Sequence, residues 1–437
     1  MINFGSDKFN KNNKIIWDEL KVVNGHFIIV GGSGTGKTYS IRNILRELTK
    51  SNDIEVHVLD VHGDIDIGDD ITSTVSFSET ADYGLNPLKI SANKDFGGVR
   101  KKIRSFMSML NRTSRALGSK QESVLTHLLK DLYFDRGFYS EDFNSWDVNV
   151  DTRKFKPSPK RHPTILDLKK YCDSKLKEIM LGTGKKGIQA LENLNKKVSQ
   201  MDKLLIKKEK TIHNAEENGK IIDKIGKQKE TCIQLYNDYI KNIENGRELD
   251  EVLKYDSSEV LKSVFEKISN LENTGIFKST SPAFDPKKPI KRYDIKSLNK
   301  DEQKMFVDIL LEDIYLAAKE KGEQSGVKTF LVIDEAHIFV SPEDEHIINV
   351  ISKEARKFGV GLILASQSFN HFSEDIIANS STKMILGIDE MFHDVASKKL
   401  KIEVKRFNYI VPHKSALIQI KKKGDLSNKF IDCLFKK

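Results

Sequence analysis

The chain has 437 residues, of which 38% are hydrophobic and 31% charged, so it is long enough for several domain-sized units with a substantial core. Its formal net charge of +9 permits a polyanionic partner. It has no apolar run of the ~18–20 residues that a membrane-spanning helix needs. It also has no apolar signal segment, and its three cysteines lack ligand spacing. We therefore expect a cytoplasmic protein without membrane contact, disulfide framework or structural zinc.

The first recognisable element is a phosphate-binding loop. Residues 31–38 match G-x-x-x-x-G-K-[ST] in full, between an apolar run at 26–30 and a helical pattern at 39–45. A strand, a glycine-rich turn and a helix N-terminus in this order surround a phosphate with backbone N–H groups. We expect Lys37 to reach the β- and γ-phosphates of ATP and the Thr38 hydroxyl to bind Mg²⁺. The predicted nucleotide-binding residues are Gly32, Ser33, Gly34, Thr35, Gly36, Lys37 and Thr38.

The middle of the chain has a different pattern. Strand-like runs at 54–60 and 71–77 belong to an α/β region, but residues 101–280 are mostly helical in character. Between about 187 and 245 we predict a coiled-coil-like hairpin with its turn at 214–220. Its first helix has apolar residues at coiled-coil spacing, namely Leu191, Leu194, Val198, Met201 and Leu205.

The α/β pattern resumes after residue 280. Strand-like runs at 291–295, 329–334, 359–365 and 383–388 alternate with helical segments, including 300–321 and 346–357. We therefore predict one α/β domain with a mainly parallel sheet, formed by residues 1–100 and 281–437 and interrupted by a helical insertion at 101–280.

The run at 329–334 ends in two acids and has the form of a Walker B motif. Mg²⁺ prefers oxygen ligands and keeps much of its water, which suits Asp334. Glu335, one residue further, is in place to polarise the attacking water. The next strand leads into Gln367, and in sheets of this type that strand lies between the Walker B and P-loop strands. We expect Gln367 to sense the γ-phosphate.

Arg356 is in the last turn of the helix predicted at 346–357. A cation at this position suits the helix dipole, which is a sufficient structural reason for it. In an oligomer the same side chain is a candidate arginine finger for the γ-phosphate of a neighbouring subunit. Lys357 and Arg292 are rival candidates for this role.

Four segments occur together in the chain: the P-loop, the sequence Asp-Val-His-Gly-Asp at 60–64, Asp-Glu-Ala-His at 334–337, and the run from Arg356 to Gln367. Asn86-Pro87-Leu88 fits the same pattern. In this combination the chain resembles the HerA branch of the HerA–FtsK superfamily of DNA-pumping ATPases. The resemblance implies a RecA-like fold, ATP and Mg²⁺ as cofactors, and the site roles given above for Lys37, Thr38, Asp334, Glu335, Gln367 and Arg356.

The resemblance also implies a homohexameric ring that moves double-stranded DNA without sequence preference. Such a ring would serve a partner nuclease or another effector, in DNA-end processing, conjugation or anti-phage defence. Typical members carry a β-barrel of ~100 residues, a domain-sized unit, before the P-loop. Only about 25 residues precede the first predicted strand here, so partnership with the usual nuclease is in question. The basic segment at 100–104 is a candidate for DNA phosphate contacts.

Other interpretations remain open from the sequence. An SMC-like ATPase also has a coiled coil between its Walker motifs, and Lys37 and Asp334 are 334 − 37 = 297 positions apart. However, no L-S-G-G-type signature precedes the Walker B run. A DEAH-box helicase would need a shorter spacing and an arginine-rich terminal motif. A nucleotide-dependent switch or assembly platform and a conjugation-type DNA pump are further alternatives.

Overall fold

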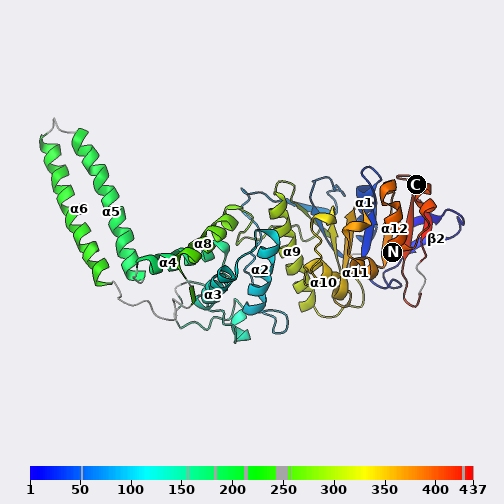
Figure 1. The fold of residues 1–437 in the computed structure, drawn as a ribbon, viewed down its shortest axis with the longest axis horizontal. Coiled ribbons are helices and arrows are strands. Elements are labelled where there is room, and N and C mark those ends of the chain that lie inside the picture. Colours follow the sequence, from blue (N-terminus) through cyan, green and yellow to red (C-terminus); the bar gives the residue numbers. More distant parts are fainter. Residues whose placement is uncertain are drawn as a thin grey trace. The chain divides into compact units, whose positions relative to one another are not determined.

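A computed structural model describes residues 1–50, 53–154, 156, 158–181, 185–210, 215–242, 254–255, 257–425 and 429–436. These residues form two compact units. The first, which we call the sheet unit, combines residues 1–116 and 274–437 (Figure 1). The second, the helical unit, comprises residues 117–273. Among the described residues, no helix is long and apolar enough to cross a membrane.

The sheet unit is built on a mixed sheet of eleven described strands in the order β2-β1-β11-β10-β9-β3-β8-β7-β4-β6-β5. From β9 to β5 all neighbours are parallel, and the four remaining strands are antiparallel. The strands are β1 (Ile2–Asp7), β2 (Lys14–Trp17), β3 (Phe27–Val30), β4 (Glu55–Asp60), β5 (Thr72–Ser76), β6 (Ile290–Asp294), β7 (Thr329–Ile333), β8 (Val360–Ser366), β9 (Thr382–Ile385), β10 (Ser415–Ile420) and β11 (Ile431–Phe435).

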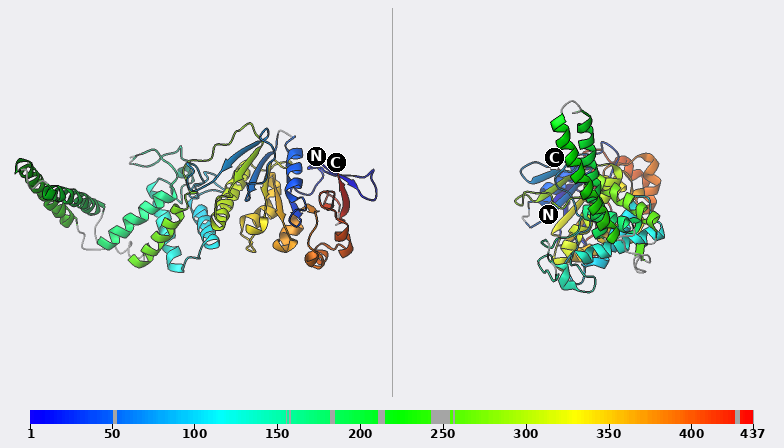
Figure 2. Two further views of the ribbon diagram at one scale, coloured as in Figure 1. Left: turned by 90° about the horizontal axis from the view of Figure 1, so that it is seen from above. Right: turned by 90° about the vertical axis from the view of Figure 1, so that its left-hand side faces the viewer.

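Helices cover both faces of this sheet, which explains why the central strands are continuous apolar runs (Figure 2). Helix α1 packs on one face, where Phe27, Phe330 and Trp17 form an aromatic cluster with ring centroids 5.2–6.2 Å apart. On the other face α10 contacts β8, α9 and α11. The helices of this unit are α1 (Lys37–Leu48), α2 (Val99–Thr113), α9 (Lys300–Glu320), α10 (Ile347–Glu354), α11 (Glu374–Asn379) and α12 (His393–Leu400), with 3₁₀ turns η2 (Ala336–Ile338), η3 (Ala355–Phe358), η4 (Phe369–His371), η5 (Glu390–Phe392) and η6 (Val404–Tyr409).

The helical unit has its own core. Leu128, Cys172 and Val264 are buried between α3, α4 and α8, and Tyr255 donates a hydrogen bond to Asp131. Helices α5 and α6 pack against each other along their length. The elements are α3 (Ser119–Asp135), η1 (Phe143–Trp146), α4 (Ile165–Leu181), α5 (Lys185–Lys210), α6 (Ala215–Lys241) and α8 (Ser258–Asn273).

The predicted fold class, α/β with a mainly parallel sheet, is confirmed, as is the position of β8 between β3 and β7. The insertion predicted at 101–280 compares with a helical unit at 117–273. The boundaries differ at their first end because α2 packs on α9 and belongs to the sheet unit.

Three details differ from the sequence predictions. Strands β1, β2, β10 and β11 were missed, because their antiparallel pairing joins the two ends of the sequence and leaves no local signal. The helix predicted at 346–357 is α10 followed by the 3₁₀ turn η3. The turn predicted at 214–220 is wrong from residue 215 onward, where α6 has already begun; Asn214 lies outside the described residues. The predicted end of the hairpin, residues 243–245, also lies outside them.

Candidate nucleotide-binding site

The glycine-rich loop turns at the carboxyl end of β3. Gly34 and Gly36 have φ of 72° and 100°, which non-glycine residues rarely adopt. The loop is tied to its neighbours: Gly31 N–H donates to the Ser366 carbonyl at 3.1 Å, and Gly32 N–H donates to the Gly387 carbonyl at 2.7 Å. Its shape is therefore fixed by the ends of β8 and β9 as well as by its own sequence.

Lys37 begins α1 and lies inside this loop. Its side chain is 9% exposed, and Nζ donates to the carbonyls of Gly31 at 2.9 Å and Gly32 at 3.2 Å. Among the described residues no carboxylate lies within 4.0 Å of Nζ. A buried cation with only neutral acceptors is suited to an anionic ligand, so the loop fits a phosphate group.

Asp334 follows β7 at the same edge of the sheet. It is 4% exposed, and its Oδ1 accepts the N–H of Glu335 at 2.9 Å. Burial, helped by the nearby charges of Glu335 and Asp64, raises the pKa of Asp334 to about 6, although the Glu335 N–H hydrogen bond and Lys37 act in the opposite direction. A buried carboxylate among other acids is suited to a cation, and with the half-buried Thr38 hydroxyl it gives the oxygen donors that Mg²⁺ prefers.

Glu335 has an unusual environment. Its backbone is left-handed, with φ of 49°, a strained conformation that is concentrated at functional sites. Its Oε2 lies 3.1 Å from Nδ1 of His337, but the geometry is not that of a hydrogen bond, and both buried atoms lack a hydrogen-bond partner among the described residues. A buried carboxylate oxygen with unused acceptor capacity is available to a water molecule or a ligand.

Two histidines continue from Glu335 toward the P-loop strand. The rings of His337 and His371 are 4.9 Å apart, and His371 Nδ1 is 2.7 Å from the Ser366 hydroxyl. Burial and the neighbouring His337 lower the pKa of His371, which favours its neutral form. No sequence motif marks His371; only the placement of β8 beside β7 brings it to the site.

Gln367 directly follows β8, between the P-loop strand and the Walker B strand. Its side chain is exposed and has no hydrogen bond to any residue that the structure describes. Because β3, β7 and β8 are parallel, residues that follow them meet at one edge of the sheet. The fold thus brings the P-loop, Asp334, Glu335 and Gln367 to a common edge.

The segment at 60–64 is a turn organised by one buried side chain. The Asp60 carboxylate is fully buried and accepts the N–H groups of Gly63 at 2.7 Å and Ile65 at 3.1 Å. This turn brings Asp64 near enough to Asp334 to affect its pKa. Asp64 is therefore part of the site, although the sequence analysis used it only as part of a family motif.

Arg356 lies at the amino-terminal ends of the parallel strands, opposite the nucleotide site at their carboxyl ends. It is in η3, before β8 begins, whereas the P-loop is beside the end of β8. Its side chain is exposed, and its guanidinium has no hydrogen bond or ion pair to any described residue. It lines a cavity of about 600 Å³ together with Lys353 and Lys357. Of the rivals, Lys357 lies over the Phe358 ring, and Arg292 is paired with the buried Asp60.

His413 also contacts the P-loop and was missed by the sequence analysis. Its Nε2 is 3.0 Å from the Gly34 carbonyl, and its ring lies edge-on to Tyr39. A Cβ added at Gly36 would be 3.0 Å from Nδ1 of His413. The histidine comes from the turn before β10, which has no recognisable motif.

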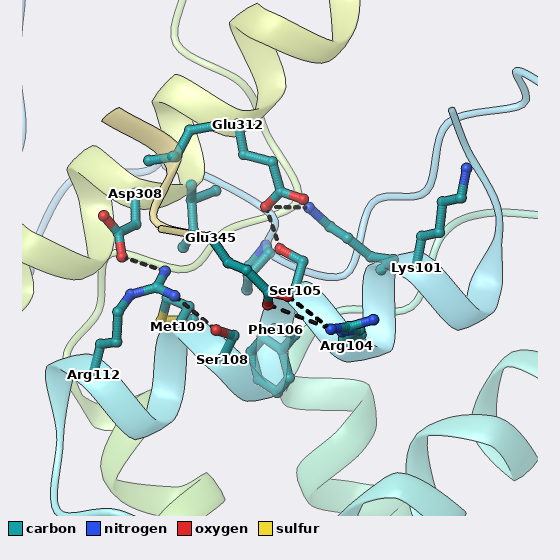
Figure 3. Close-up of a pocket in the computed structure, with 14 residues that line it drawn as sticks. Lys101, Arg104, Ser105, Phe106, Ser108, Met109, Arg112, Asp308, Glu312 and Glu345 are labelled. Carbon is teal, nitrogen blue, oxygen red and sulfur yellow. Dashed lines mark hydrogen bonds and ion pairs between the residues drawn. The ribbon is translucent and has the colours of Figure 1, made fainter. Parts of the chain in front are cut away.

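The basic segment at 100–104 forms the start of α2, where its cations have local partners. Lys102 is buried, with Nζ 3.4 Å from Glu312 and 3.8 Å from Asp313. Arg104 is 3.0 Å from Glu345 across a cavity of about 240 Å³, shown in Figure 3. These pairs neutralise much of the charge that made the segment a candidate for DNA contacts.

A family model described as "Helicase HerA, central domain" matches residues 10–236, more than half of the chain. The DNA double-strand break repair helicase HerA of Pyrococcus furiosus is 26% identical over 202 residues, which are 36% of this chain and 37% of that protein. The protein of the same name from Sulfurisphaera tokodaii is 33% identical over 105 residues, 22% and 21% of the two chains. The chain thus matches little more than a third of the length of these relatives at most.

Solved structures share the fold over nearly the whole chain. VirB4 of Thermoanaerobacter pseudethanolicus has a TM-score of 0.61 at 16% identity, covering 100% of this chain and 96% of that one. The plasmid coupling protein TrwB in complex with the non-hydrolysable ATP analogue ADPNP has a TM-score of 0.54 at 11% identity, covering 96% and 90%. At these identities the likeness concerns the fold, a RecA-like P-loop ATPase architecture.

Proposed function

Because the chain belongs to the HerA helicase central-domain family, we propose that it is an ATPase whose hydrolysis of ATP drives movement along DNA. The observation that carries this proposal is the common edge of the sheet, where the P-loop, Asp334, Glu335 and Gln367 meet. Each has a different and complementary property: a buried cation, a buried carboxylate, an unpaired acidic oxygen and an exposed amide.

Each of these residues has a chemical task in the proposal. The residues from Gly32 to Thr38 bind the triphosphate, with Lys37 moving its Nζ from loop carbonyls to phosphate oxygens. Thr38 and Asp334 hold Mg²⁺, which when bound offsets phosphate charge. Glu335 accepts a proton from the attacking water through its unpaired oxygen. Gln367 donates a hydrogen bond toward the γ-phosphate.

The position of Arg356 supports an oligomer. On its own subunit it is separated from the P-loop by the whole of β8, Val360–Ser366. A cation at that edge can act on a γ-phosphate only if another copy of the chain brings its P-loop there. We propose a homohexameric ring in which Arg356 serves as the arginine finger, since this also encloses a central path for double-stranded DNA.

DNA contacts in such a ring are proposed at backbone phosphates, without base readout. A nuclease or another effector is the proposed partner that uses the movement, in DNA processing or anti-phage defence. Two cellular processes are indicated by the names of similar proteins. The HerA relatives are named for double-strand break repair, and TrwB is named as a plasmid coupling protein. A conjugation-type DNA pump is therefore retained as an alternative setting for the same motor.

The decisive experiment measures ATP hydrolysis with and without double-stranded DNA for the wild type and Glu335→Gln. We expect DNA to stimulate the wild type, and Glu335→Gln to bind ATP but turn over about 10²–10⁴-fold more slowly, as for loss of a general base. A nucleotide-dependent switch or assembly platform would instead bind ATP and hydrolyse it slowly, at a rate that DNA does not change. Mass measurement with an ATP analogue and DNA tests the ring, and a stable monomer would contradict it.

A further inference from the structure

A cavity of about 380 Å³ at the β9–β10 side of the sheet unit is lined by five lysines and a single acid. It lies apart from the nucleotide site. The parallel register pairs Thr382 with Phe27, at the start of the P-loop strand, whereas the P-loop follows that strand's end. The lysines are Lys383, Lys398, Lys399, Lys401 and Lys421, and the acid is Glu374.

Lys383 forms the base of this cavity and is only 3% exposed. Its Nζ donates to the Ser380 carbonyl at 2.8 Å and to Oε1 of Gln419 at 3.0 Å, both neutral acceptors. Burial and, to a smaller extent, the nearby Lys421 lower the pKa of Lys383 to about 7. A lysine buried beside a second lysine is costly in the absence of a counter-charge.

No described carboxylate lies within 4.0 Å of any of the five ammonium groups. Lys421 donates only to the Ala378 carbonyl, at 3.1 Å. The cavity beside α2 is different, because there Lys102, Arg104 and Arg112 each have an acidic partner. The cavity around Lys383 thus carries positive charge without acidic partners among the described residues, unlike the cavity beside α2.

Helix dipoles account for part of this arrangement, but they supply no counter-charge for five lysines around one cavity. Lys398 and Lys399 are in the last turn of α12, where cations suit the helix dipole. Lys383, on β9, and Lys421, directly after β10, donate to the Ser380 and Ala378 carbonyls at the C-terminal end of the short helix α11, where the dipole suits cations but no described carboxylate pairs with them. Lys401 has a left-handed backbone, with φ of 55°, which is unfavourable for a lysine. Three chain segments therefore converge on one concave, positively charged site.

We propose that this cavity is a phosphate-binding site, with Lys383 at its base and Lys398, Lys399, Lys401 and Lys421 around its mouth. A tetrahedral phosphate group supplies several acceptors and the negative charge that the lysines lack. Such a group has two sources, the backbone of DNA and a free phosphate anion. The site itself does not depend on the proposed motor function; only the DNA source rests on it.

The first arm of the test measures free phosphate. The full chain is saturated with Mg·ADP, so that the P-loop is occupied, and titrated calorimetrically with inorganic phosphate at an ionic strength fixed with chloride. Lys383→Met keeps the length of the side chain and removes a buried charge, so the fold is expected to tolerate it. We expect a loss of phosphate affinity of about tenfold or more, as for one charge-assisted contact.

The second arm measures the salt dependence of double-stranded DNA binding. The double variant Lys398→Gln, Lys401→Gln changes two exposed side chains and carries little risk of misfolding. If the phosphate belongs to DNA, the slope of log Kd against log salt should fall by about 2, or about 1 for each lost contact. The matched control is Lys422→Gln, an exposed lysine outside the cavity, which should leave both arms unchanged.

The two arms together decide the proposal. A response of the first arm alone identifies a free anion, and a response of the second identifies the DNA backbone; either supports the site. If neither arm distinguishes the cavity variants from the wild type and from Lys422→Gln, the site does not exist. A wild type that shows no DNA-stimulated ATP hydrolysis would remove the motor function, yet the phosphate arm would still test the cavity.

Discussion

Arg292 on β6 and the fully buried Asp60 on β4 form an ion pair across neighbouring strands, with an Arg292 terminal nitrogen 2.6 Å and Nε 2.8 Å from Oδ2 of Asp60. The Asp60 carboxylate also holds the N–H groups of Gly63 and Ile65. Arg292 is thus a structural partner of the 60–64 turn, and its guanidinium is committed within its own subunit.

We predict that Arg292→Met destabilises the sheet unit by about 3–5 kcal/mol, because it leaves a buried carboxylate without its counter-charge. Urea denaturation followed by tryptophan fluorescence measures this, since Trp17 lies in the core of the same unit. The double variant Asp60→Asn, Arg292→Met removes both charges and keeps an oxygen acceptor for the turn, so it should lose less. A single variant as stable as the wild type would show that the pair is not needed.

In contrast to Arg292→Met, Arg356→Ala is predicted to leave stability almost unchanged and to reduce ATP hydrolysis. Its side chain is exposed and unpaired among the described residues, so stability should change by less than about 0.5 kcal/mol. ATP hydrolysis should fall by about 10³-fold or more if it is an arginine finger. Lys357→Ala is the matched control, one residue away and also exposed.

Mixing variants tests whether Arg356 acts between subunits. Arg356→Ala retains an intact P-loop, and Glu335→Gln retains an intact Arg356. A mixture of the two forms some interfaces with both functional halves, so it should hydrolyse ATP faster than either variant alone. A mixture no faster than the average of the separate proteins would place Arg356 outside the catalytic interface.

The common edge of the site could be predicted from the sequence because each of its motifs directly follows a strand that the local sequence pattern reveals. A strand followed by Gly31–Thr38, and another followed by Asp334 and Glu335, define two strand ends, and the parallel sheet brings them together. Contacts that depend on non-local packing had no such signal. His413 reaches the P-loop from 379 residues away, and His371 reaches His337 only because β8 pairs with β7.

Partners of charged residues were equally hidden from the sequence. Arg292, in the middle of β6, is paired with a buried acid, whereas Arg356, just before β8, is exposed, and the sequence does not distinguish the two arginines. The basic run at 100–104 stood out in the sequence, whereas the lysines around Lys383 are scattered between residues 383 and 421. Only the fold gathers the second set and gives Lys102 and Arg104 of the first set their acidic partners.

Two P-loop glycines provide a further prediction. Gly34 and Gly36 both have positive φ, so alanine strains the backbone at either position, by roughly 1–2 kcal/mol. An added Cβ at Gly34 would meet nothing within 4 Å, whereas at Gly36 it would press on the His413 ring. We therefore expect Gly36→Ala to be the more destabilising change in thermal unfolding. Adding His413→Ala should restore part of the stability that Gly36→Ala loses and none of the stability that Gly34→Ala loses. If His413→Ala had the same effect on both glycine variants, a close contact between residue 36 and His413 would be excluded.

Asp334→Asn should stabilise the nucleotide-free protein in a pH-dependent way. Burial raises the pKa of Asp334 from 3.8 to about 6, so the folded state binds its proton more tightly than the unfolded state. The resulting stability is fully present below pH ~4 and is lost as pH rises to ~6, above which the ionised carboxylate costs up to about 3 kcal/mol. Asparagine keeps the acceptor for Glu335 N–H and removes the charge.

The gain in stability from Asp334→Asn should accordingly be near zero at pH 4 and largest at pH 7–8. Thermal unfolding at low salt without Mg²⁺ measures it. With Mg·ATP at pH 7–8 the wild type should become more stable than Asp334→Asn, because only the carboxylate is stabilised by the cation. Asp64→Asn is the matched control: it removes a nearby charge that raises the Asp334 pKa, so it should give a smaller gain in the same direction. A gain for Asp334→Asn that is equally large at pH 4 would show that ionisation of Asp334 is not its cause.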